Sequence, residues 1–165
     1  MTPSELAERI RVRYADVIVA RGETAVVVDR ERLLETLEDL RRDEELRLDF
    51  LSSVTATDWP GRTPRFWVAY ELHSLAHGHR LRVKVGVPDE DPSVPSVVPL
   101  FPTADWHERE TYDLFGVVFD GHPDLRRILM PEGWEGHPLR KTEELGGVNT
   151  RFRGAFIPPV DRRTT

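Results

Sequence analysis

The chain has 165 residues, 39% of them hydrophobic and 32% charged, so it can bury one core beneath a highly charged surface. Its formal net charge of -6 argues against nucleic-acid binding, because that binding depends largely on Lys and Arg neutralising phosphates. The absence of cysteine excludes disulfides, thiol nucleophiles, Cys-ligated zinc and conventional Fe–S clusters. No segment approaches the roughly 20 apolar residues that span a bilayer, so we expect the chain in the cytoplasm or on a cytoplasmic face.

The N-terminal part predicts a helix, a hairpin and a second helix. Thr2 and Glu5 can form a capping box, and apolar residues then recur at helical spacing, so a helix should run to about Arg13. Two β-branched runs around a Gly-containing turn predict a hairpin within residues 16–29. Asp29 can cap the leucine-rich helix that follows.

The middle of the chain is rich in predicted strands. Alternating apolar and polar residues predict strands at 46–59, 65–74 and 79–88. This order of elements favours an α+β fold with a mixed, largely antiparallel sheet and helices packed on one side. The proline-rich stretch 88–102 should be an irregular connection. Beyond Gly116 we expect a short strand and tight turns, and residues 142–165 should form an extended C-terminal arm after a single domain over residues 1–141.

A charged helix precedes Gly116 and carries the first candidate site. Arg109 lies four residues from both Asp105 and Asp113, so it can bridge the two acids, and the simpler interpretation is a solvated ladder of ion pairs that contributes little stability. Glu110 lies four residues from both Trp106 and Leu114, which places it beside the expected apolar stripe. A carboxylate there needs a donor from elsewhere, and the candidates are Arg126, Arg127 and Arg140.

Enzymatic interpretations of this helix are weaker. Glu108 and Glu110 point to different helix faces, so they cannot flank one scissile bond. His107 and Glu110 share a face, but a catalytic metal usually needs a third protein ligand. The sequence has no phosphate-binding glycine loop and no G-x-S-x-G elbow.

Three further histidines, His73, His77 and His79, fall at the tip of a predicted hairpin. Clustered imidazoles can bind zinc or copper, although a polar loop tip is the simpler interpretation. A free-standing His/carboxylate metalloenzyme is therefore the alternative of another class, and a regulatory adaptor is a third. The region with two Gly-His-Pro turns, at 121–123 and 136–138, is locally basic and would suit an acidic protein surface.

The stretch 108–141 resembles the signature of the C subunit, or 30-kDa subunit family, of the proton-pumping NADH–quinone oxidoreductase, respiratory complex I. The family pattern is Glu-Arg-Glu, an acid and two apolar residues, then His or Lys, a basic residue and an apolar pair. All positions match: the chain supplies Glu108-Arg109-Glu110, Asp113, Leu114-Phe115, His122, Arg126 and Ile128-Leu129. A pattern with this many constrained positions is specific, and a looser resemblance extends over residues 1–141.

The resemblance implies a non-catalytic subunit of the peripheral arm, on the cytoplasmic side of the cell inner membrane. It would bind no flavin, Fe–S cluster, quinone or metal itself, because FMN and the clusters belong to other subunits. Its partners would be the D subunit (49-kDa type), the B subunit and other peripheral-arm subunits, with no nucleic acid and no direct membrane span. Equivalent subunits of F420H2 dehydrogenases and membrane-bound hydrogenases are the related alternative. The charged helix would then be a scaffold and docking element, with the interface signature Glu108, Arg109, Glu110, Asp113, His122, Arg126, Arg127 and Arg140.

Overall fold

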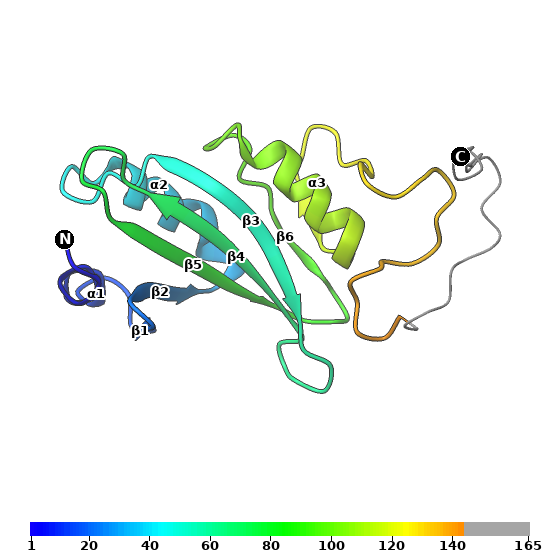
Figure 1. The fold of residues 1–165 in the computed structure, drawn as a ribbon, viewed down its shortest axis with the longest axis horizontal. Helices are drawn as coiled ribbons and strands as arrows, with labels where there is room; N and C mark the ends of the chain where they lie inside the picture. The colour runs from blue at the N-terminus through cyan, green and yellow to red at the C-terminus, as the bar shows by residue number, and fades with distance from the viewer. Residues whose placement is uncertain (144–165) are drawn as a thin grey trace, which may run out of the picture.

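The computed structural model describes residues 1–143, and a five-stranded sheet forms its centre (Figure 1). The strand order is β1-β2-β5-β4-β3, and every neighbouring pair is antiparallel except the parallel pair β2–β5. The sheet is therefore mixed and largely antiparallel, as predicted. Its strands are β1 (Val17–Ala20), β2 (Glu23–Val28), β3 (Phe50–Asp58), β4 (Phe66–His73) and β5 (Arg80–Val87).

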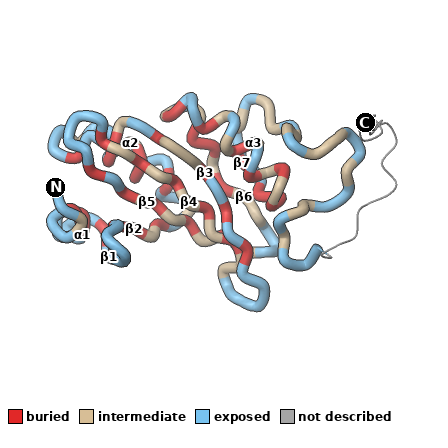
Figure 2. Tube along the Cα trace, viewed as in Figure 1, coloured by how far each residue is buried: buried red, intermediate tan, exposed pale blue. Residues whose placement is uncertain are grey.

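One face of the sheet is buried under the helices and the other is partly open. In β4 and β5 every second side chain is buried and the residues between them are mostly half-buried (Figure 2). The buried set joins the apolar faces of the helices in one cluster, and each such side chain contributes about 1.5–3 kcal/mol. The helices are α1 (Pro3–Arg11), the 3-10 helix η1 (Arg30–Arg32), α2 (Leu33–Arg42) and α3 (Ala104–Phe115).

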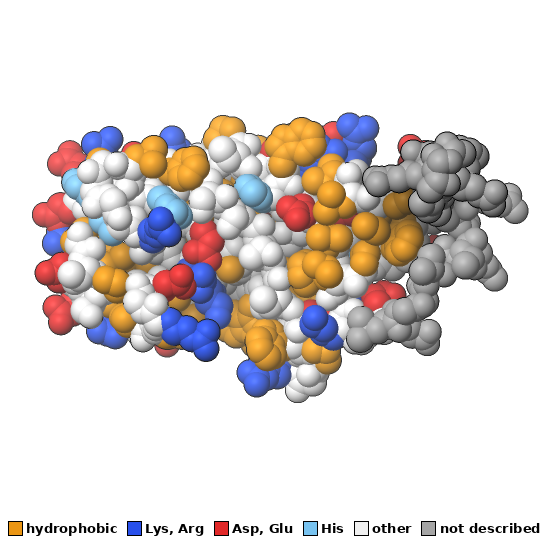
Figure 3. Space-filling model, viewed as in Figure 1, with side chains coloured by type: hydrophobic (Ala, Val, Ile, Leu, Met, Phe, Trp, Pro, Cys, Tyr) orange, Lys and Arg blue, Asp and Glu red, His pale blue; other side chains and the backbone are white. Residues whose placement is uncertain are grey.

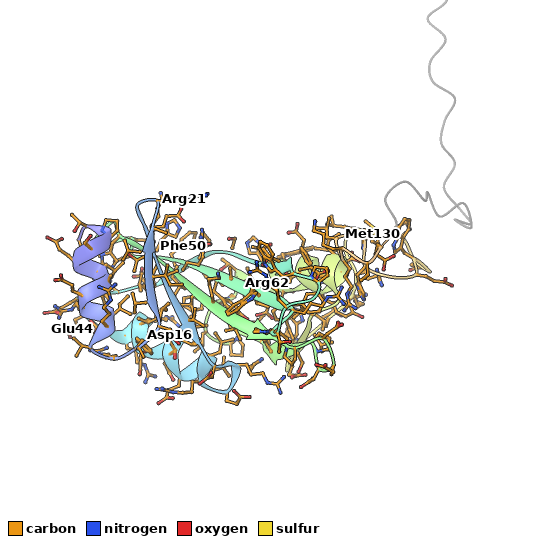
Figure 4. All side chains as sticks on the ribbon, turned by 90° about the horizontal axis from the view of Figure 1, so that it is seen from below. Asp16, Arg21, Glu44, Phe50, Arg62 and Met130 are labelled. Carbon is orange, nitrogen blue, oxygen red and sulfur yellow. The ribbon has the colours of Figure 1, made fainter. Side chains whose placement is uncertain are left out.

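Several local predictions are confirmed. The capping box of α1 is present, with the Thr2 amide donating to Glu5 Oε2 at 2.8 Å and the Glu5 amide donating to Thr2 Oγ1 at 3.3 Å. The hairpin β1–β2 turns at Arg21 and Gly22, whose φ angles of 54° and 78° suit the tight turns that join twisted strands. In Figure 4, Arg21 lies at the tip of this hairpin.

Two boundaries differ from the prediction. The strand expected from residue 46 begins at Phe50, because Leu46 and Leu48 are buried in a turn segment in which Arg47 has a φ of 40°. Asp29 precedes η1 and not an α-helix, and its side chain makes no capping hydrogen bond. Alternation and a capping residue type do not distinguish these irregular turns from regular elements.

A second, two-stranded sheet holds α3 at the β3 side of the molecule. Within the proline-rich stretch, β6 (Ser93–Pro95) pairs in parallel with β7 (Val118–Asp120), the short strand expected after Gly116. α3 lies beside β3, and residues 116–143 continue past it toward the end of the molecule opposite α1 (Figure 1). In Figure 4, Met130 lies at that end and Glu44 at the other.

None of the helices within residues 1–143 is long and apolar enough to cross a membrane. The extended arm predicted at 142–165 lies outside the described residues, apart from its first two positions.

Candidate docking site around the charged helix

The helix α3 buries a stripe that differs from the expected one. Its buried positions Ala104, Glu108, Thr111 and Phe115 recur at spacings of three and four, so they lie on one face. Trp106, which was expected on that face, is 63% exposed. The stripe is therefore mostly small or polar, and it contains a carboxylate.

Glu108 is that carboxylate, and its side chain is completely buried. Its Oε2 accepts a hydrogen bond of 2.7 Å from the Ser96 hydroxyl, and its Oε1 accepts one of 2.7 Å from the Val97 amide. Burial raises the pKa of Glu108 to about 7 against the opposing effect of these two hydrogen bonds, and the nearby Asp105 carboxylate also raises it. The contacts fasten α3 to the connection that follows β6.

The expectation that arginines hold a partly buried Glu110 is wrong. Glu110 is exposed, and no ion pair involving it occurs within residues 1–143. The buried acid is Glu108, two residues earlier, which lies on the opposite side of the helix. The error came from choosing Trp106 and Leu114 as the markers of the buried face.

Asp113 is also completely buried, and it organises the chain after β7. Its Oδ2 accepts hydrogen bonds from three consecutive amides, those of Ile128, Leu129 and Met130, at 3.0, 2.7 and 2.9 Å. Its Oδ1 accepts a hydrogen bond of 3.0 Å from Arg127. Burial alone would raise the pKa of Asp113, but the three amides and the Arg127 charge outweigh it and hold the pKa below its ordinary value. The signature acid therefore fixes the backbone of the signature's apolar pair.

The predicted bridge from Arg109 to Asp105 and Asp113 is also wrong. The Arg109 guanidinium packs over the Trp106 ring, 4.9 Å from its centroid, and its Nε donates to the Arg126 carbonyl at 3.2 Å. A solvent-exposed ion-pair ladder needs both acids on the outer face, and Asp113 lies in the interior. Arg109 instead joins the exposed side of α3 to the segment after β7.

The side chain of His122 is completely buried against the first turns of α3. The Asp124 amide donates to His122 Nδ1 at 3.0 Å, so the ring proton of the neutral imidazole is on Nε2. That Nε2–H donates to the Asp105 carbonyl at 3.2 Å. Arg126 holds the Asp124 carboxylate through two hydrogen bonds of 2.6 Å, which keeps this turn in place.

The end of α3 is capped by residues of the second Gly-His-Pro turn and its arginine. Gly116 ends the helix with a φ of 72°, and Arg140 Nε donates to the Phe115 carbonyl at 2.6 Å. His137 Nδ1 donates to the Asp113 carbonyl at 2.9 Å, and burial lowers the pKa of His137, which favours the neutral ring. Two of the last carbonyls of the helix are thus satisfied by its own chain.

A further anchor, not singled out in the sequence, joins the sheet to residues 141–142. Asp58 at the end of β3 has a fully buried side chain that accepts two hydrogen bonds from Arg65, at 2.8 and 3.0 Å, and one of 2.8 Å from the Lys141 amide. The Arg65 hydrogen bonds lower the pKa of Asp58 below its ordinary value, against the effect of burial. The sequence did contain a signal for this ion pair. Asp58 and Arg65 lie seven positions apart, at the end of one predicted strand and the start of the next, where cross-strand neighbours come together.

Seven of the eight residues of the predicted interface signature therefore make side-chain hydrogen bonds within residues 1–143, and Glu110 is the exception. Glu110 lines a groove of about 320 Å³ between α3 and β3. The other lining residues include Ser53 and Thr55 of β3, His107 and Leu114 of α3, and Leu139, which is 44% exposed. We call this groove the docking face, and Figure 3 shows apolar side chains gathered over this part of the molecule.

The histidines at the β4–β5 turn do not form a metal site within the described residues. The rings of His77 and His79 stack with centroids 5.8 Å apart, while His73 contacts the Ser52 hydroxyl at 3.1 Å. No group of three or more His, Asp or Glu side chains in residues 1–143 is arranged to hold a metal ion. His79 is 4% exposed, so the simpler interpretation of all three as a polar loop tip was wrong for this residue.

This fold and site define a class of protein: an α+β scaffold whose charged helix binds the segments on either side of it. The family model for the respiratory-chain NADH dehydrogenase 30 Kd subunit matches residues 26–149, and the chain belongs to this family.

Curated relatives agree with the family assignment. The chain is 50% identical over 148 residues to the C subunit of the NADH-quinone oxidoreductase of Nocardioides sp., covering 89% of this chain and 59% of the relative. It is 46% identical over 165 residues to the C subunit of the Mycobacterium ulcerans enzyme, covering 97% of this chain and 69% of that protein. The chain thus spans about three fifths to two thirds of the length of these relatives.

Solved structures share the fold. The trypsin-resistant fragment (1–134) of Nqo5 superposes with a TM-score of 0.65 at 38% identity, covering 76% of this chain and all of the fragment. A chain of the membrane-bound sulfane sulfur reductase, an archaeal respiratory membrane complex, superposes with a TM-score of 0.75 over 98% of both chains. At 22% identity the second likeness shows the fold alone.

Proposed function

We propose that the chain is a non-catalytic structural subunit of the peripheral arm of a proton-translocating NADH-quinone oxidoreductase. In this role it docks on the D subunit (49-kDa type), near the B subunit, at the cytoplasmic side of the cell inner membrane. Membership of the 30 Kd subunit family and the relatives named as C subunits support the proposal. The observation that carries it is the use of the signature side chains: Asp113, His122, Arg127 and Arg140 bind the chain's own backbone.

Side chains used in this way build a shaped surface around α3. Asp113 accepts three backbone amides and an arginine, so little of its hydrogen-bonding capacity remains. The docking face presents Leu139 and Leu114 beside His107 and Glu110. Apolar residues at the centre of a patch with polar residues at its rim are typical of a protein interface.

The proposal assigns the redox chemistry to other subunits. Electrons would pass from NADH through FMN and Fe–S clusters held elsewhere to quinone. The sequence supports this assignment because it contains no cysteine, and conventional clusters are ligated by cysteine thiolates.

Co-expression with the cognate D-type subunit tests the proposal. Affinity capture of this chain should bring down the D subunit in equal amount, and the pair should elute together from a sizing column in moderate salt. The two proteins eluting separately, each as a folded species, would overturn the proposed docking.

A further inference from the structure

The inner side of α3 carries an ionisable cluster whose residues do not line the docking face. The side chains of Glu108 and His122 are both completely buried, and His122 Nε2 lies 4.0 Å from Glu108 Oε2 and 3.4 Å from Asp105 Oδ1. Asp105 Oδ1 is itself buried and has no hydrogen-bond partner within residues 1–143. The imidazole N–H, which donates to the Asp105 carbonyl, therefore also lies close to the carboxylates of Asp105 and Glu108.

No permanent cation balances this cluster within the described part of the chain. The residues that face Glu108 are Asp105 on α3, His122 after β7, Tyr70 on β4 and Ser96 after β6. His122 is a neutral donor because its Nδ1 accepts the Asp124 amide. Tyr70 is fully buried, and burial together with the Glu108 charge raises its pKa well above the ordinary value, so the phenol stays neutral. A buried carboxylate that lacks a cation favours its protonated form.

The contacts of Glu108 can accommodate either protonation state. As a carboxylate it accepts from the Ser96 hydroxyl and the Val97 amide. As an acid it can donate its O–H to Ser96 Oγ across the same 2.7 Å, because a hydroxyl both donates and accepts, while Oε1 keeps the Val97 amide. A proton can therefore enter or leave without breaking the link between α3 and residues 96–97.

We propose that Glu108, Asp105 and His122 form a proton-binding site on the inner side of α3, which holds one proton in the folded chain in mildly acidic solution and releases it as the pH rises through neutrality. The bound proton is on the Glu108 carboxyl. The neighbouring His122 and Asp105 determine how tightly this carboxyl binds the proton. The packing of α3 against the connection after β6 and the turn after β7 then varies in strength with pH.

The direction of the pH dependence follows from the pKa values. The Glu108 pKa is about 7 in the folded chain, raised from 4.5, so the folded state binds the proton more tightly than the unfolded state. The contribution of protonated Glu108 to stability is fully present below about pH 4.5 and is lost as the pH rises through about 7. Between these values, a difference of one bound proton changes the unfolding equilibrium constant about tenfold per pH unit.

Two measurements on the full chain test the site, with Glu110→Gln as the matched control on the exposed side of the same helix. Carbon-13 NMR of the glutamate carboxyls should show one resonance that titrates near pH 7, retained in Glu110→Gln and absent in Glu108→Gln. Urea unfolding between pH 5 and 7 should show the unfolding constant of the parent chain, relative to Glu108→Gln, rising about tenfold per pH unit. His122→Lys adds a permanent cation, so the same carboxyl should titrate at least one pH unit lower.

Two results together would overturn the proton-binding site. All glutamate carboxyls would titrate below about pH 5.5, and the unfolding constants of the parent and Glu108→Gln would change with pH in the same way. The NMR titration uses the unmodified chain, so it decides the question even if a variant folds poorly. Neither measurement involves the D subunit, and failure of the proton site is therefore distinct from failure of the proposed docking.

Discussion

Three acids within six positions of α3 occupy three different environments, and the environment decides what each one does. Glu108 is buried against a hydroxyl and an amide without a cation, Glu110 is exposed in the docking face, and Asp113 is buried against an arginine and three amides. The pKa is raised for Glu108 and lowered for Asp113, because donors outweigh burial only at the latter.

Asp113→Asn should lower the free energy of unfolding by about 2–4 kcal/mol, because Arg127 loses its charged partner and one amide oxygen must serve all the backbone donors. Since the pKa of Asp113 is lowered by folding, this stabilisation should be present above about pH 4 and disappear as the pH falls further. Urea unfolding at pH 7 measures the change. Asp120→Asn, on the exposed side of β7, is the control and should stay within about 0.5 kcal/mol. An equally small effect of Asp113→Asn would show that the acid does not anchor the segment.

At this scale the sequence indicates which charged residues matter but not their partners. The signature identified Asp113 and Arg127, whereas the main partners of Asp113 are backbone amides, which side-chain identities do not reveal. The assignment of Glu110 as the buried acid failed because an exposed Trp106 was taken to mark the apolar stripe.

At the scale of elements, the regular pieces were predictable and their ends and contacts were not. Alternation located β3, β4 and β5, because one face of the sheet is buried and the other is only partly covered. The parallel pair β2–β5 and the β6–β7 ribbon depend on pairing between segments far apart in the chain, which local periodicity does not encode. The end of α3 is likewise completed by His137 and Arg140, more than twenty residues later.

Gly116→Ala should destabilise the chain more than Gly121→Ala does. Both glycines have positive φ, 72° and 81°, so each substitution costs about 1 kcal/mol from backbone conformation. A Cβ at Gly116 would also lie 2.5 Å from the His137 ring and 2.6 Å from the Arg140 guanidinium, whereas nothing lies within 4 Å at Gly121. Displacing the cap should add about 1–3 kcal/mol and increase protease cleavage within residues 131–143. Equal urea midpoints and equal cleavage for the two variants would contradict the capping role of this turn.

At the scale of the whole molecule, the chain is a sheet-and-helix scaffold with the proposed docking face at one end. The turn between β4 and β5, by contrast, carries His77 and His79, and Leu75 in the same turn is 73% exposed. The α+β class was evident from the order of the elements, while the membership of the 30 Kd subunit family rests on the signature and the relatives. The position of the docking face could not be read from the sequence, because it depends on Leu139 returning beside α3 and β3.

The most direct test of the proposed docking is the amount of the D-type partner that Leu139→Asp retains on an affinity column, with Leu75→Asp as the control. Both leucines are exposed, at 44% and 73%, so neither change should unfold the chain. A carboxylate in the docking face should reduce capture at least tenfold, because a charge buried in an interface without a partner costs several kcal/mol. Leu75→Asp should bind as the parent chain does. Equal capture by the two variants would contradict the assignment of this groove as the docking face.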